Sequence, residues 1–172
     1  SSPVELTIPT YDGSGQAVHP SVVRIPGKLG GYEYWMAMTP YANGNAALEN
    51  PSIVASNDGI TWVVPDGLSN PVAGPPKDVQ RYFYCDPELV YEHANNRLVL
   101  WYRYIDRTGE DSRFFKRTSV DGVTWSEETV CSIAGAAIDA NPNAFGIARD
   151  QLAGQWYMWE SAMSTTYAPL EI

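Results

Sequence analysis

The sequence lacks long apolar runs and has few of the residues that bind metal ions. It contains two cysteines, two histidines and only 18% charged residues, and no apolar run reaches the roughly 18 residues that a transmembrane helix requires. No cysteine or histidine spacing is typical of a metal site. Cys85 and Cys131 form either a disulfide or two buried free thiols, and free thiols are favoured. We therefore expect no membrane insertion, no metal and no cofactor.

Helix signals are also missing. Apolar residues do not recur at helical spacing, and 14 glycines and 13 prolines interrupt most of the chain. Aromatic residues are abundant instead, at 12% of the total, in runs such as "YEYWMAM" and "RLVLWYRY". Such runs are typical of β-strands that are covered on both faces. The chain is therefore predicted to be all-β.

Positive charge is scarce as well, and the formal net charge is −9 with a pI of about 4.5. A chain of this charge repels phosphate backbones, so nucleic acid is not expected as a partner. Neutral sugars suit a surface that is acidic and rich in aromatic rings. Solubility alone is the favoured explanation of the charge, and a glycan or cell-surface polysaccharide is the expected partner.

A seven-residue phrase occurs twice, as "SNDGITW" at 56–62 and "SVDGVTW" at 119–125. A larger unit recurs around it, opening with a polar residue and proline and continuing with an apolar stretch, a turn and a strand rich in Trp and Tyr. The openings are His19-Pro20, Asp86-Pro87 and Asn141-Pro142. Four-stranded units repeated at roughly forty to seventy residues are typical of a β-propeller. A β-sandwich, the alternative, gives no reason for the repeat.

The sequence predicts a single partial propeller domain over 1–172, built from blades of four antiparallel strands. Strands are expected near 21–25, 32–38, 51–56 and 61–64, and again near 88–92, 97–104, 113–119 and 124–126. Blade one then covers about 17–67, blade two about 84–128 and the start of blade three about 139–162. These are about two and a half blades of a five-bladed ring. A second chain or a missing C-terminal half is expected to complete it.

The repeated phrase resembles the Asp-box of sialidase-like propellers, although the commoner form of that motif has one more residue between Asp and Thr. The resemblance implies a structural role at the hairpin between the third and fourth strands. The Asp carboxylate is expected to accept backbone N–H bonds, the Gly to supply a positive φ, and the Trp to pack between blades. The residues concerned are Ser56, Asp58, Gly59, Trp62, Ser119, Asp121, Gly122 and Trp125.

The polar residues that open the first strands are candidates for a functional site, because first strands line the channel of a propeller. His19, Asp86 and Asn141 are expected to converge, with Asp139 close by. The Asp-Pro at a blade start resembles the five-bladed glycosidases of glycoside hydrolase family 43, which use three carboxylates. The resemblance implies a catalytic role for Asp86. The sequence departs from that family because His19 stands in place of the base and Asn141 cannot ionise.

The stretch "TPYANGNAALENPSI" at 39–53 combines groups that bind sugars. Amides and carboxylates bond to sugar hydroxyls, and aromatic faces pack against the C–H side of the ring. A solvated loop in which Asn and Gly serve turns is the alternative. The candidate substrate-binding residues are Tyr41, Asn43, Asn45, Glu49 and Asn50, with Trp35 beside them.

A group of cations lies further along the chain. It offers a site for an anionic sugar or phosphate, but pairing with neighbouring acids on the surface is the favoured interpretation. The cations are Arg103, Arg107, Arg113, Lys116 and Arg117, and the acids are Asp106, Glu110 and Asp111.

Three functions fit these features. The leading prediction is glycan recognition by an extracellular or virion propeller, since the repeated turns also resemble those of phage tail receptor-binding proteins and no complete carboxylate set is visible. The first alternative is a glycoside hydrolase with Asp86 in the active site. The second is a structural or assembly module whose open sheet edges pair with another subunit.

Overall fold

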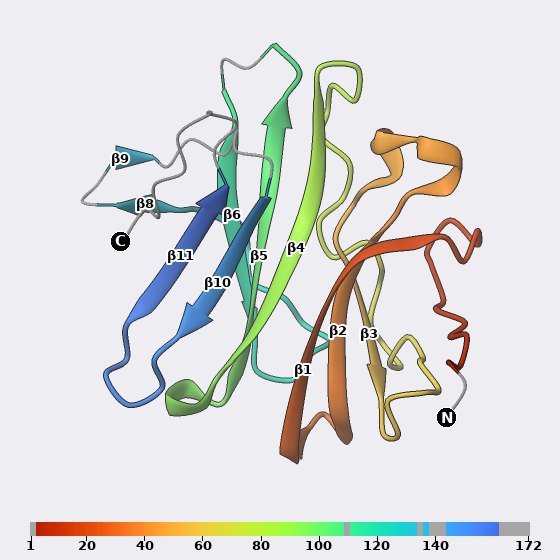
Figure 1. Ribbon diagram of the computed structural model, residues 1–172, viewed down its shortest axis with the longest axis vertical. Helices are drawn as coiled ribbons and strands as arrows, with labels where there is room; N and C mark the ends of the chain where they lie inside the picture. Colours follow the sequence, from red (N-terminus) through yellow and green to blue (C-terminus); the bar gives the residue numbers. More distant parts are fainter. Residues whose placement is uncertain (1–2, 109–110, 134–135, 138–143, 162–172) are drawn as a thin grey trace.

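The chain forms antiparallel β-sheets that stand side by side (Figure 1), and the prediction of an all-β propeller fold is confirmed. The computed structural model describes all residues except 1–2, 109–110, 134–135, 138–143 and 162–172. Within the described residues the only helical pieces are the short 3-10 turns η1 (Ala42–Gly44), η2 (Ala46–Leu48) and η3 (His93–Asn95). No helix in this part of the chain is long and apolar enough to span a bilayer.

The first two sheets correspond to blades one and two. Blade one has the order β1 (Ala17–Leu29), β2 (Tyr32–Pro40) and β3 (Ser52–Ser56). Blade two has the order β4 (Tyr82–Glu92), β5 (Arg97–Asp106), β6 (Arg113–Ser119) and β7 (Thr129–Val130). The middle strands β2 and β5 are buried over most of their length, as expected for apolar runs covered on both faces.

The remaining strands form two hairpins. β10 (Ala144–Arg149) pairs with β11 (Trp156–Ser161), and β8 (Ser132–Ile133) pairs with β9 (Ala136–Ala137). The first strands β1 and β10 both contact β4, so the three sheets meet along their first strands (Figure 1). This arrangement brings residues at equivalent positions of β1 and β4 together.

The core lies between the sheets. One apolar cluster joins blades one and two through side chains such as Trp35, Leu100 and Tyr102. A second joins blade two to the β10–β11 hairpin and includes Trp101, Phe114 and Met158. Cys85 and Cys131 are both buried free thiols within this second cluster. Face-to-face packing of successive sheets fixes the blades relative to one another.

Both copies of the repeated phrase form the same turn. Oδ1 of Asp58 accepts the backbone N–H groups of Ile60 at 2.8 Å and Thr61 at 2.7 Å, and Asp121 does the same for the equivalent pair at 2.8 and 2.7 Å. These hydrogen bonds lower the pKa of Asp58. Gly59 and Gly122 have φ values of 73° and 80°. The carboxylates therefore hold their own backbone.

The tryptophans of the two turns lie in different surroundings. Trp62 is buried against Met36 and Met38 on the outer face of blade one. Trp125 packs at the edge of the core between blades one and two, and its indole N–H donates to the carbonyl of Gly122 at 3.2 Å. Of the two turn tryptophans, only Trp125 therefore packs between blades one and two.

The fourth strands differ from the prediction. The expected strand at 61–64 is reduced to one bridge between Ala55 and Val63, because the preceding residues wrap around Asp58. The expected strand at 124–126 is absent, and β7 pairs with β6 further along the chain. There the Ser126 hydroxyl replaces a carbonyl as acceptor for the N–H of Thr118 at 3.0 Å, so the regular ladder begins later.

The first strands also differ from the prediction, because β1 and β4 begin before the segments expected at 21–25 and 88–92. The His19-Pro20 and Asp86-Pro87 pairs therefore lie inside their strands and do not open them. Asn141 and Asp139, which were expected beside them, lie outside the described residues.

Candidate active site

His19 and Asp86 occupy matching irregularities in their strands. The β1–β2 register shifts between Val18 and Ser21, and the β4–β5 register shifts between Cys85 and Glu88. Both residues have left-handed backbone conformations, with φ values of 50° and 49°. Such conformations cost a non-glycine residue about 1–2 kcal/mol, and bulges of this kind redirect a side chain out of the sheet. The two bulges turn the side chains of His19 and Asp86 toward each other.

Four side chains form a continuous polar cluster at this point. His19 Nδ1 lies 3.1 Å from Asp86 Oδ1 and 3.8 Å from Glu49 Oε2. The other oxygen of Asp86 accepts a hydrogen bond from Arg103 Nη1 at 2.5 Å. The His19 side chain is 52% exposed, whereas those of Glu49 and Arg103 are 7% and 8% exposed. The cluster therefore opens to solvent through the imidazole and is closed behind it.

The electrostatics of the cluster suit proton transfer. Burial, followed by the negative charge of Asp86, raises the pKa of Glu49 to about 7, and the positive charges of Arg103 and Arg107 offset part of this rise. A carboxyl group whose pKa lies near neutrality can both give and take a proton in that range. Groups with perturbed pKa values gather at functional sites, so Glu49 is a candidate for acid–base chemistry.

The loop that carries Glu49 is held from behind. The hydroxyl of Tyr11 donates to the carbonyl of Leu48 at 2.9 Å and accepts from the amide of Asn50 at 2.8 Å. The Asn45 side chain caps the η2 turn by accepting the N–H of Ala47 at 3.1 Å. The N-terminal segment thus fixes the backbone on both sides of Glu49.

Several predicted substrate-binding residues have a different role. Trp35 has no exposed surface and packs between blades one and two, so the prediction that it contacts sugar is wrong. Asn50 is 2% exposed and satisfies Tyr11 and Ala47, so it too is structural. Tyr41, Asn43 and Asn45 are exposed on the same loop.

Sequence reasoning missed the role of Arg103. It was expected to pair on the surface, but it is buried and bound to Asp86. An arginine within the apolar run "RLVLWYRY" was the available signal, because a charge in a doubly covered strand requires a buried partner. Among the described residues, no group of three or more His, Cys, Asp or Glu side chains is arranged to hold a metal ion.

The fold and the cluster together define a set of propeller blades with a histidine, two carboxyl groups and an arginine gathered beside the first strands. No family model matches the chain. A curated relative, the A type blood N-acetyl-α-D-galactosamine deacetylase of Flavonifractor plautii, is 39% identical over 112 residues, which are 64% of this chain and 14% of that protein.

Solved structures give the same picture of the fold. The crystal structure of an N-acetylgalactosamine deacetylase from F. plautii, in complex with blood group B trisaccharide, matches 92% of this chain with a TM-score of 0.77 and 28% identity. The Penicillium chrysogenum α-L-arabinanase matches 94% with a TM-score of 0.61 and 16% identity. The chain spans 50% and 46% of these two structures.

Proposed function

We propose that this chain forms part of a carbohydrate-active enzyme, with Glu49, His19 and Asp86 as its acid–base centre. The observation that supports this most strongly is a buried carboxyl group with a near-neutral pKa beside an exposed imidazole that a carboxylate holds in place. The similarity to N-acetylgalactosamine deacetylases suggests the reaction, which is hydrolysis of the acetamido group of an N-acetylated galactosamine unit in a glycan.

The geometry suits an amide hydrolysis. Nδ1 of His19 faces the Asp86 carboxylate, so the N–H lies on that side and Nε2 keeps its lone pair. Nε2 takes a proton from water as the water oxygen attacks the acetyl carbonyl carbon. The Glu49 carboxyl group then gives its proton to the nitrogen as the C–N bond breaks. The products are acetate and the free amino sugar.

Glycoside hydrolysis is the second candidate, because two carboxyl groups, Asp86 and Glu49, lie beside the same imidazole and glycosidases act through such a pair. Their distances from His19 Nδ1 set an upper limit of about 7 Å on the separation of their nearest oxygens, and retaining glycosidases use roughly 5–5.5 Å. In this reaction Glu49 protonates the glycosidic oxygen. Arg103 holds Asp86 and leaves it less free to act as a nucleophile.

The test uses the full-length protein that contains this chain. It is incubated with trisaccharides ending in N-acetylgalactosamine or in galactose, and the products are analysed by mass spectrometry. Deacetylation releases acetate and leaves a trisaccharide lighter by one acetyl group, whereas glycoside hydrolysis releases a monosaccharide. Binding without either product would contradict the proposal and favour pure glycan recognition.

Variants locate the activity. Glu49→Gln and Asp86→Asn are expected to lower kcat by about a hundredfold or more, the range for loss of a general acid or base. Glu127→Gln removes an exposed carboxylate in blade two and serves as the matched control. Unchanged turnover in both Glu49→Gln and Asp86→Asn would contradict the assignment of the centre.

A further inference from the structure

A crevice separate from the acid–base cluster lies on the blade-one side of blade two. It is closed on one side by the connection at 76–78 and on the other by β4, β5 and β6, and its volume is about 380 Å³. This lies within the range of about 300–1,000 Å³ that small-molecule sites occupy. Among the described residues, those that line it belong to blade two or to the connection that precedes it.

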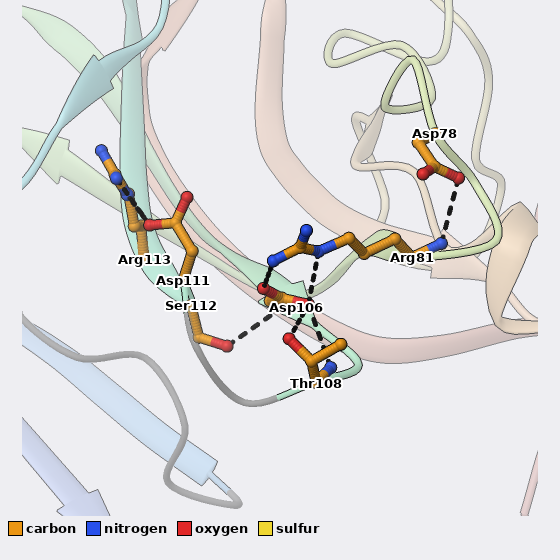
Figure 2. A network of polar contacts seen from close by, with 7 residues as sticks. All are labelled: Asp78, Arg81, Asp106, Thr108, Asp111, Ser112 and Arg113. Atoms are coloured by element: carbon orange, nitrogen blue, oxygen red, sulfur yellow. Dashed lines mark hydrogen bonds and ion pairs between the residues drawn. The ribbon is translucent and has the colours of Figure 1, made fainter.

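The walls of the crevice are held by buried charge. Arg81 binds Asp106 through two hydrogen bonds of 3.1 and 2.7 Å, and Asp106 also accepts from Thr108 (Figure 2). The Asp106 side chain has no exposed surface. Asp78, at the start of the same turn, accepts the backbone N–H of Arg81 at 3.2 Å. This network fixes the connection against the end of β5, so the opening does not depend on a loose loop.

The floor of the crevice is aromatic. Tyr82 and Tyr104 stack with centroids 4.7 Å apart and an interplanar angle of 18°. The Arg81 guanidinium lies over the Tyr82 ring, 5.0 Å from its centroid. Phe115 meets the Tyr104 ring edge-on at 5.6 Å. Within the described part of the chain, neither the Tyr82 nor the Tyr104 hydroxyl makes a hydrogen bond to another residue. Two phenol groups therefore remain available to a ligand.

Three of the five charged residues that line the crevice are paired within the protein, and the other two are Lys77 and Asp78. Arg113 pairs with Asp111 at 2.5 Å (Figure 2). Glu128 accepts from the hydroxyl of Tyr102 at 2.9 Å and lies 3.7 Å from Arg117. Because these charges are matched within the protein, an anionic or cationic ligand gains little from them. A neutral ligand with many hydroxyl groups can use their remaining donors and acceptors.

We propose that this crevice binds a neutral saccharide unit, as a second glycan-binding site. Aromatic ring edges, free phenol groups and paired charges for the hydroxyls of a sugar occur together here. Tyr104 directly follows Arg103 on β5, and successive residues of a strand point to opposite faces. The crevice and the Arg103 side of the acid–base cluster therefore lie on opposite faces of one sheet. The proposal rests on the proposed function only for the class of ligand.

The test measures binding apart from turnover. The full-length protein carrying Glu49→Gln is titrated by calorimetry with blood group B trisaccharide and with β-1,3-galactotriose. Adding Tyr82→Ala is expected to weaken the better-bound probe by about tenfold, since loss of a ring contact and a hydroxyl is worth about 1.4 kcal/mol. Tyr104→Phe keeps the ring and its packing, and is expected to weaken binding by about threefold.

Trp159→Ala is the matched control. It removes an exposed aromatic residue of β11, 51% accessible, that does not line the crevice, and is expected to leave affinity unchanged. Tyr104→Phe is informative even if Tyr82→Ala fails to fold. The proposal is overturned if neither probe binds, or if both tyrosine variants bind as well as the parent. Tyrosine-dependent binding without enzymatic turnover would refute the proposed function alone.

Discussion

The packing of the repeated turn of blade two against blade one can be tested with one methyl group. A Cβ added at Gly122 would lie 2.0 Å from Cη2 of Trp35 and within 2.6 Å of two further atoms of that ring. The equivalent glycine of blade one, Gly59, provides an internal control. A Cβ there would meet nothing nearer than Tyr34, at 4.0 Å. Both glycines have similar positive φ values, so the variants differ only in their surroundings.

The expected magnitudes follow from these distances. Each Gly→Ala change places an alanine in the left-handed region, which costs about 1–2 kcal/mol. At Gly122 the methyl group must also displace Trp35, which has no exposed surface. Overpacking of this kind costs about 1–3 kcal/mol more. We therefore expect a loss of about 2–5 kcal/mol for Gly122→Ala and about 1–2 kcal/mol for Gly59→Ala.

The assay is urea unfolding of the full-length protein, followed by tryptophan fluorescence. The free energies of unfolding of the variants are compared with one shared dependence on urea concentration. Trp35 is itself a reporter, because its displacement changes the emission of the folded state. Equal losses for the two variants, or a larger loss for Gly59→Ala, would refute the close packing of this turn against blade one.

Three further predictions concern charge. The pKa of Glu49 is raised from 4.5 to about 7 in the folded protein, so its contribution to stability is fully present below pH 4.5 and is lost as the pH rises through about 7. Glu49→Gln should therefore match the wild type in free energy of unfolding below about pH 4. At pH 8 the variant should be more stable than the wild type by up to about 3 kcal/mol. Equal stability at both pH values would contradict this. The pKa of Asp58 is lowered in the folded protein, so its pH dependence runs the other way. The ionised Asp58 carboxylate stabilises the fold at neutral pH, and this stabilisation disappears in acid. The difference in unfolding midpoint between wild type and Asp58→Asn should therefore narrow when the pH falls below about 4. Arg103→Met leaves Asp86 without its buried guanidinium partner and should cost about 3–5 kcal/mol in urea unfolding, with partial recovery in Arg103→Lys.

The architecture could be predicted from the sequence because it is written in local signals. Runs such as "YEYWMAM" specify strands covered on both faces, and the repeated turn specifies where two of these sheets fold back. The fourth strand of blade two could not be placed, because a single hydroxyl decides the outcome. Ser126 bonds to the backbone of Thr118 in place of a carbonyl, and such competition between side chain and backbone leaves no trace in the apolar pattern.

The acid–base centre could be predicted from the sequence only in part, because part of it depends on burial. The approach of His19 and Asp86 follows from matching Xaa-Pro positions on neighbouring first strands, which the sequence displays. The near-neutral pKa of Glu49 depends on burial in a loop that Tyr11 anchors from more than thirty residues away. The ion pair of Arg103 with Asp86 depends on which face of β5 the Arg103 side chain occupies. Spacing can locate groups along a strand, but proton affinity is set by what covers them. The chemistry of this centre therefore resides as much in Tyr11 and Arg103 as in the residues that meet solvent.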